Sequence, residues 1–315
     1  MANSSYNDES DYDRGVNKES MDKLSMLCVI LAGVSWGTAG VFSDFLQKYG
    51  FSPFQMSTGR TLFASVFMLL FVLRYNPKLL KVTPRQLTLY ALSGLGLLGT
   101  SSFYYWAMEL TSFSTAAVLM YTAPIIVMVI SVLFLGERFT WIKALGLLGA
   151  FFGCCLVTGI IGNSRFSLVG ILVGLLSGIS YSMYNICVKL EMNHGDHPIG
   201  ATTYCFIFSF LASLFFIDPV ESVTMVLNSP IEALISIAGM GFFIGAFPYL
   251  VYTFAMQKIP AGVASAMACI EPMTASIISV LFLHEKMTVF SAMGIILILG
   301  SVVLLALEGK KKEKS

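Results

Sequence analysis

The chain has 315 residues, of which 56% are hydrophobic and only 12% are charged, and its mean hydropathy is +0.79. Soluble domains carry about 25% charged residues, so this composition excludes an ordinary water-soluble globular protein. The formal net charge of +1 gives no support to nucleic-acid binding. We therefore expect an all-α integral membrane protein whose surroundings are a lipid bilayer.

Residues 1–23 are polar and carry charges of both signs. They lack the basic segment followed by an apolar run that marks a cleaved signal peptide. We expect this segment to be a disordered cytoplasmic tail, with the first apolar segment retained as a helix.

Ten apolar segments follow, each near the length of about 20 residues that a helix needs to cross a bilayer. Only a helix satisfies its own backbone hydrogen bonds in lipid, so we predict ten transmembrane helices. Residues 218–230, between two of the segments, are expected to form a short surface helix. The predicted limits are 24–46, 54–74, 86–107, 113–135, 141–161, 168–189, 199–217, 231–254, 261–283 and 288–308.

Lys and Arg residues are unevenly distributed over the predicted loops. An even number of spans places both termini on one side, and that side collects most basic residues, including Lys189 and those of the basic tail 309–315. We assign Lys48 and Arg60 to the opposite side, which holds few. Because cytoplasmic loops are enriched in Lys and Arg, we expect a multi-pass protein of the cell (plasma or inner) membrane with both termini in the cytoplasm.

All six cysteines lie inside apolar segments, without the spacing of a zinc site or a disulfide framework. The sequence also lacks a glycine-rich phosphate loop and paired catalytic groups in the spans. We therefore expect no metal, no cofactor, no ATP-driven step and no enzymatic activity.

An internal repeat appears when the chain is compared with itself at an offset of 148 residues. Between residues 104–148 and 252–296, 15 of 45 positions are identical, including Pro124 with Pro272 and Glu137 with Glu285. Shared apolar composition does not explain paired Pro, Glu, Thr and Gly residues at one offset. We predict two repeats of five spans, residues 24–161 and 168–308.

Five is an odd number, so the second repeat is predicted to enter the membrane in the opposite orientation. Inverted repeats are the usual construction of secondary transporters, because exchange of conformation between two such halves opens a site to alternate sides.

The chain resembles the EamA-type branch of the drug/metabolite transporter superfamily. The resemblance covers about residues 24–308 and implies ten helices, a central cavity and metabolite export. His284 replaces the usual Gly before the second-repeat Glu, and Tyr181 stands where the first repeat has Trp36. The residues that carry the resemblance are Ser35-Trp36-Gly37, Arg60, Pro124, Leu135-Gly136-Glu137-Arg138, Glu271-Pro272 and Leu283-His284-Glu285-Lys286.

Glu271 lies near the middle of its predicted span. A carboxylate at that depth is costly and marks a functional site by default. It is a candidate to bind a substrate ammonium group or to take up a proton; the structural alternative is a protonated carboxyl bonded to a neighbouring helix. The first repeat has Ala123 at the matching position, so the role is predicted to be asymmetric.

Aromatic and polar residues at mid-depth are the other candidates for substrate binding, because cavities for organic solutes combine aromatic walls with a few polar groups. Core packing, or an interfacial belt in the case of Tyr104, is the alternative. Pro124 and Pro272 break the helical hydrogen-bond pattern and are candidate hinges. The binding candidates are Trp36, Tyr104, Tyr121, Tyr181, Asn185 and Tyr252.

Glu137 and Glu285 end repeat-equivalent spans and are expected to cap or pair at the membrane surface. Glycines at four-residue spacing, such as Gly33 with Gly37 and Gly174 with Gly178, are predicted to allow close helix packing.

Together these features predict a secondary transporter or facilitator that exports small organic metabolites, amino acids or related compounds first among them. A drug or organic-cation exporter is the alternative, and a membrane-embedded enzyme a remote one. A nucleotide-sugar or sugar-phosphate carrier is disfavoured because we expect no Lys or Arg at mid-membrane depth. The sequence leaves open whether protons are the coupling ion and whether the chain forms a homodimer.

Overall fold

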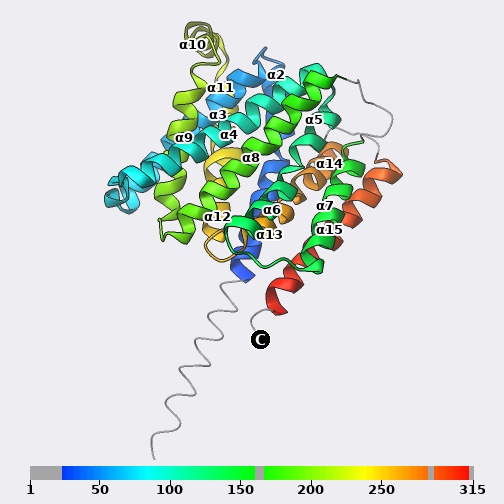
Figure 1. Ribbon diagram of the computed structural model, residues 1–315. Coiled ribbons are helices and arrows are strands. Elements are labelled where there is room, and N and C mark those ends of the chain that lie inside the picture. The colour runs from blue at the N-terminus through cyan, green and yellow to red at the C-terminus, as the bar shows by residue number, and fades with distance from the viewer. Residues whose placement is uncertain (1–22, 160–166, 283–286, 312–315) are drawn as a thin grey trace, which may run out of the picture.

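The computed structural model describes residues 23–159, 167–282 and 287–311, and these contain helices and no strand (Figure 1). Residues 23–37 form the N-terminal helix. The other helices are α2 (Ala39–Gln47), α3 (Pro53–Tyr75), the 3₁₀ turn η1 (Pro77–Leu80), α4 (Pro84–Leu110), α5 (Phe113–Met120), α6 (Ala123–Phe134), α7 (Trp141–Val157), α8 (Leu168–Asn193), α9 (Pro198–Ser213), α10 (Pro219–Asn228), α11 (Ile231–Met240), the π-helical turn η2 (Gly241–Ala246), α12 (Phe247–Ala255), α13 (Ala261–Met267), α14 (Ile270–Phe282) and α15 (Val289–Lys311).

The chain is a multi-pass helical membrane protein by the length and hydropathy of its helices. Within the described ranges, seven helical stretches are long and apolar enough to span a bilayer. Two further apolar helices, α7 and α9, are shorter, and α4 has 27 residues of lower hydropathy. Each of the ten segments expected from the sequence contains helix where it is described, although some run past the helix end, as 199–217 does beyond α9. That all ten cross the bilayer stays a prediction.

Local sequence explains where several helices begin. The side chains of Ser52 and Thr83 each accept a hydrogen bond from the backbone N–H of the third helical residue, and the side chains of Gln55 and Gln86 each accept one from the backbone N–H of the cap residue. These are two complete capping boxes, each followed by proline at the first helical position. The expected surface helix at 218–230 is α10, which begins with Asp218 accepting hydrogen bonds from the backbone of Val220 and Glu221.

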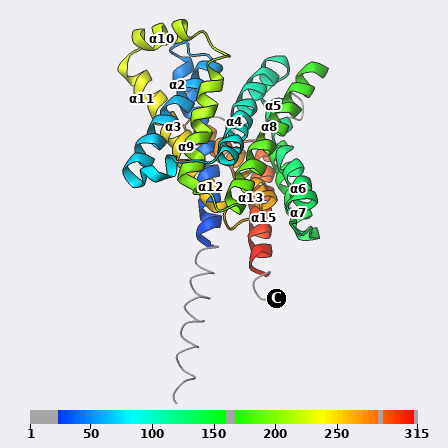
Figure 2. The same cartoon turned by 60° about the vertical axis from the view of Figure 1, so that its left-hand side comes forward.

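The halves of the chain pack against each other in a reciprocal pattern. In the first half, α4 packs on α8 and α9; in the second, α11 and η2 pack on α2 and α3. The last helix of each half, α7 and α15, also pack together. Figures 1 and 2 show the first described residues and the end of α15 at the same end of the bundle, with α10 at the other.

The reciprocity extends to single residues. A Cβ at Gly178 in α8 would lie 2.7 Å from Thr122 Oγ1 and 3.4 Å from the carbonyl oxygen of Met120. A Cβ at Gly33 would lie 3.2 Å from Ile270 and 3.4 Å from the carbonyl oxygen of Ala268. Ile270 and Ala268 are 148 residues beyond Thr122 and Met120. The predicted close packing at these glycines is confirmed, and it joins the first helix of each half to the broken helix of the other.

Candidate functional site

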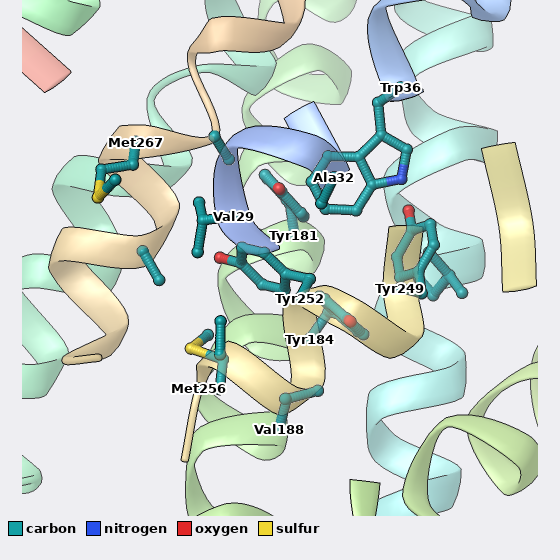
Figure 3. Packing of buried hydrophobic residues seen from close by; sticks show 14 of the residues in the cluster. Val29, Ala32, Trp36, Tyr181, Tyr184, Val188, Tyr249, Tyr252, Met256 and Met267 are labelled. Atoms are coloured by element: carbon teal, nitrogen blue, oxygen red, sulfur yellow. The ribbon is translucent and has the colours of Figure 1, made fainter. Parts of the chain in front are cut away.

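A group of aromatic rings fills the crossing of the N-terminal helix with α8 and α12. The ring centroid of Trp36 lies 4.9 Å from that of Tyr249 and 5.4 Å from that of Tyr252. Tyr249 in turn lies 5.5 Å from Tyr184 in an edge-to-face arrangement. Figure 3 shows these rings clustered, with Trp36 reaching in from the N-terminal helix. All four side chains are buried, so they form an apolar cluster at this helix crossing.

A chain of hydrogen bonds runs through the same crossing. The Tyr252 hydroxyl donates to Asn185 Oδ1 at 2.6 Å, and Asn185 Nδ2 donates to the carbonyl oxygen of Tyr181 at 2.8 Å. Asn185 and Tyr252 are completely buried. The structure therefore brings four of the predicted site residues together, Trp36, Tyr181, Asn185 and Tyr252. Buried polar groups whose hydrogen bonds are satisfied in this way fix the side chains around the site in one arrangement.

Glu271 lies next to this group, as the second residue of α14. Its side chain is half-buried, and no hydrogen bond or direct ion pair to its carboxylate is found among the described residues. The start of a helix favours a negative charge, because backbone N–H groups point toward it. Tyr104, Tyr121 and Tyr181 all lie close enough to interact with it electrostatically. Two further predicted residues, Tyr104 and Tyr121, thus border the same region.

Arg60 enters this region from α3, which corrects two expectations. It is the eighth of the 23 residues of α3, so it lies inside a span rather than in a loop. The argument against phosphate-bearing substrates, that no basic residue lies at such depth, therefore fails. Because Arg60 lies in the first turns of an apolar stretch, the sequence suggested a charge in a loop. In the structure η2 and α4 enclose the side chain, and its Nη2 donates a hydrogen bond to Ser101 Oγ at 3.0 Å.

Arg60 and Glu271 interact electrostatically without a direct ion pair between them. Arg60 also lies within hydrogen-bonding reach of the Tyr249 hydroxyl, while its buried Nε has no hydrogen-bond partner in the described part of the chain. The region therefore holds one basic and one acidic side chain, which are not in direct contact and are bordered by aromatic rings. The sequence reasoning used Arg60 as a loop charge and as a mark of the family, and it missed Ser101.

Lys189 requires a similar correction. The sequence reasoning counted it with loop residues, but it lies inside α8 and is buried. Its Nζ donates to the carbonyl oxygens of Met256 and Ile259, at 2.8 and 2.9 Å. These carbonyls follow the end of α12, where helical partners run out, so a buried ammonium satisfies them.

The two spans that contain Pro124 and Pro272 are each broken about one turn before that proline. α5 ends at Met120 and α6 begins at Ala123; α13 ends at Met267 and α14 begins at Ile270. Pro124 and Pro272 thus stand in the first turn of α6 and α14, where a missing N–H costs nothing. The breaks are where the prolines predict them. Pro272 lies beside Glu271, whereas Pro124 belongs to the other broken helix, next to Tyr121.

Glu137 caps a helix of the other half, as expected of a capping residue: its Oε1 accepts a hydrogen bond from the backbone N–H of Ala261 at 2.7 Å. Its repeat partner Glu285, with His284 and Lys286, lies outside the described residues.

Comparison with known proteins agrees with these features. The model of the EamA-like transporter family matches the chain twice, at residues 23–159 and 168–307. The uncharacterized transporter YoaV of Bacillus subtilis is 27% identical over 288 residues, covering 87% of this chain and 93% of that protein. The uncharacterized inner membrane transporter YicL of Salmonella typhimurium is 24% identical over 297 residues, covering 92% and 97%.

A solved crystal structure superimposes with a TM-score of 0.75 at 16% identity, covering 92% of this chain and 98% of that chain, which shows a shared fold. The two matches of the family model together span most of the sequence. The chain belongs to the EamA-like transporter family and is a multi-pass membrane transporter.

Proposed function

We propose that this transporter is a secondary carrier that exports amino acids or closely related zwitterionic metabolites. The observation that carries the proposal is the separated pair of charges, Arg60 and Glu271, beside a group of aromatic rings. An amino acid presents a carboxylate and an ammonium group at a fixed spacing, and two unpaired opposite charges match that pattern.

Arg60 is assigned to the substrate carboxylate, because a guanidinium binds carboxylates through two parallel hydrogen bonds. Its Nε has no hydrogen-bond partner in the described residues and can supply one of these two donors. Glu271 is assigned to the ammonium group, since its carboxylate engages no described donor. Tyr104 and Tyr121 border the pair and supply hydroxyl and ring surfaces to the side chain of the substrate.

Alternating access is the proposed mechanism. The reciprocal contacts of Gly33 and Gly178 with the two broken helices support it, because equivalent contacts on the two halves can exchange conformations. The breaks beside Pro124 and Pro272 supply the proposed hinges. We further propose ten spans in two inverted repeats, with both termini in the cytoplasm, from the uneven distribution of Lys and Arg.

An organic-cation exporter is the second candidate. It is favoured by one observation, that Glu271 is half-buried and bears no described hydrogen bond amid aromatic rings, as a site for a lone cation requires. The two candidates differ in what they ask of Arg60: an amino-acid carrier needs its charge, whereas a cation carrier does not.

The deciding experiment measures efflux from proteoliposomes of L-tyrosine and of tyramine, the amine that lacks only the carboxylate. We expect wild-type protein to move tyrosine, Arg60→Gln to lose tyrosine efflux by about tenfold or more, and Glu271→Gln to lose efflux of both compounds. Arg74→Gln, at the exposed end of the same helix, is the matched control and should leave efflux unchanged.

Two results decide against an amino-acid carrier. Efflux of tyramine but not tyrosine, unaffected by Arg60→Gln, supports the organic-cation exporter instead. Efflux of tyrosine that survives both Arg60→Gln and Glu271→Gln removes the charge pair from substrate recognition.

A further inference from the structure

A second carboxylate lies inside the helix bundle, away from the charge pair. Glu191 is in the last turn of α8, six residues beyond Asn185 and so about 9 Å further along the helix axis. It is completely buried at the contact of α8 with α4 and α9. Neither carboxylate oxygen has a hydrogen-bond partner among the described residues. An unpaired buried carboxylate is too costly to stay charged, so this position calls for a bound cation or a proton.

A neighbouring hydroxyl group favours the proton over a bound cation. Ser93 of α4 lies beside the Glu191 carboxyl. Ser93 Oγ already donates its one proton to the carbonyl oxygen of Tyr90 at 3.0 Å. As long as the hydroxyl keeps that bond, it offers Glu191 an acceptor, to which a carboxyl group donates only when it is protonated.

Asp196 completes the cluster from the α8–α9 connection. Gln86 Nε2 donates to Asp196 Oδ1 at 2.8 Å, and the Tyr90 hydroxyl lies within hydrogen-bonding reach of the same carboxylate. The amide orientation of Gln86 is fixed, because its Oε1 accepts from the backbone N–H of Thr83 at 2.8 Å. Asp196 therefore meets hydrogen-bond donors, whereas neither carboxyl oxygen of Glu191 has a partner among the described residues.

The remaining neighbours do not supply a countercharge. Cys187 of α8 and Cys205 of α9 are the other titratable groups near Glu191, together with Tyr90 and Asp196. The described residues bring no Lys or Arg to it and contain no group of three His, Cys, Asp or Glu side chains that could hold a metal ion. Hard metal ions ask for six or more oxygen ligands, which this cluster does not provide.

We propose that Glu191 is a proton-binding residue that couples transport to the proton gradient, and that Asp196 passes the proton between Glu191 and water. Asp196 is buried, but Gly195 and His197 on either side of it are exposed. In the exchange, the Glu191 carboxyl gives its proton to the Asp196 carboxylate, which releases it to water; uptake is the reverse.

Loss of the Glu191 proton is proposed to change how the helices around it pack. Release of the proton leaves an unpaired negative charge where α4 crosses α8 and α9, and that charge is relieved when the helices separate and water reaches it. The coupling part rests on the proposed function as a secondary carrier; the binding of a proton does not.

Infrared spectroscopy of the purified full-length protein tests proton binding without any substrate. A protonated carboxyl group absorbs separately from a carboxylate. We expect such a band at neutral pH in wild-type protein and in Glu271→Gln, and its loss in Glu191→Gln. A band that persists in Glu191→Gln, or that is lost only in Glu271→Gln, overturns the assignment.

Flux under an imposed pH gradient tests coupling. We expect the gradient to accelerate tyrosine efflux from wild-type proteoliposomes, and Glu191→Gln to reduce that acceleration at least tenfold while efflux down a tyrosine gradient persists. Asp196→Asn should keep the infrared band but slow its exchange. Tyrosine efflux that ignores the pH gradient in wild-type protein refutes coupling; absence of efflux of both tyrosine and tyramine refutes the proposed function and leaves the infrared result to judge Glu191.

Discussion

Glu137 and Ala261 are joined across the two halves of the molecule: the carboxylate between α6 and α7 of the first repeat accepts a hydrogen bond at 2.7 Å from the first backbone N–H of α13 in the second. Lys189 lies near the same carboxylate and holds the chain segment that precedes α13 through Met256 and Ile259. A half-buried charged cap at the start of a helix contributes more to the free energy of unfolding than a neutral cap does.

Removal of this cap should destabilise the protein. For Glu137→Ala we expect a loss of about 1.5–3 kcal/mol of unfolding free energy, the range for hydrogen bonds to charged groups. Thermal unfolding in detergent measures it. Glu109→Ala, at an exposed position near the end of α4, is the control and should change stability by less than about 0.5 kcal/mol. Equal effects of the two substitutions would show that the cap contributes nothing.

Gly37 and Gly40 offer a matched pair on neighbouring turns. A Cβ at Gly37 would lie 2.8 Å from the carbonyl oxygen of Glu271 and 2.5 Å from Thr274 Cβ, whereas a Cβ at Gly40 would meet nothing within 4 Å. We expect Gly37→Ala to cost about 1–3 kcal/mol and to impair transport, because α14 must move away together with Glu271. Gly40→Ala should be neutral or stabilising by up to about 1 kcal/mol. Unfolding and efflux measurements on both variants decide; similar values for the two would contradict the close approach.

Loss of the Tyr252 hydroxyl should destabilise the protein through its hydrogen-bond partner Asn185. Tyr252→Phe keeps the ring beside Trp36 but leaves the buried Asn185 Oδ1 without its donor. We expect a destabilisation of about 1–3 kcal/mol in thermal unfolding. Tyr75→Phe, where the side chain is 60% exposed, serves as the comparison and should be silent. An unchanged midpoint for Tyr252→Phe would mean that the hydrogen bond adds no net stability.

The proposed orientation has a labelling test. In a variant without the six native cysteines, which are all free, a cysteine at Lys81 should react with a membrane-impermeant thiol reagent only from the cytoplasmic side. A cysteine at Val223, exposed on α10, should react only from the opposite side. The reverse pattern would place both termini outside.

Helix positions were predictable because only a helix satisfies its own backbone hydrogen bonds in lipid. The long apolar runs of the described residues therefore form helices. The breaks at Tyr121 and Cys269 followed from Pro124 and Pro272, which remove a donor from the helical pattern. The π-helical turn Gly241–Ala246 was not predictable, since its glycines indicate close packing but not the extra residue per turn.

Arg60 and Lys189 show where sequence reasoning stops. Hydropathy treats a basic residue near the end of an apolar run as a loop residue, and only tertiary packing shows that Ser101 or the carbonyl oxygens of Met256 and Ile259 receive its charge. Glu191 was overlooked for the same reason, being outside the predicted limits of its span, while Glu271 stood out because no other charge is near it in sequence.

The reciprocal packing of Gly33 and Gly178 bears on how such a chain arose and is made. The first helix of each half covers the broken helix of the other, so a half-length polypeptide alone would expose its own glycine face and its own broken helix to lipid. A gene encoding one half would need a second copy as its partner. Two separately expressed halves of this protein should likewise be stable together and be degraded apart.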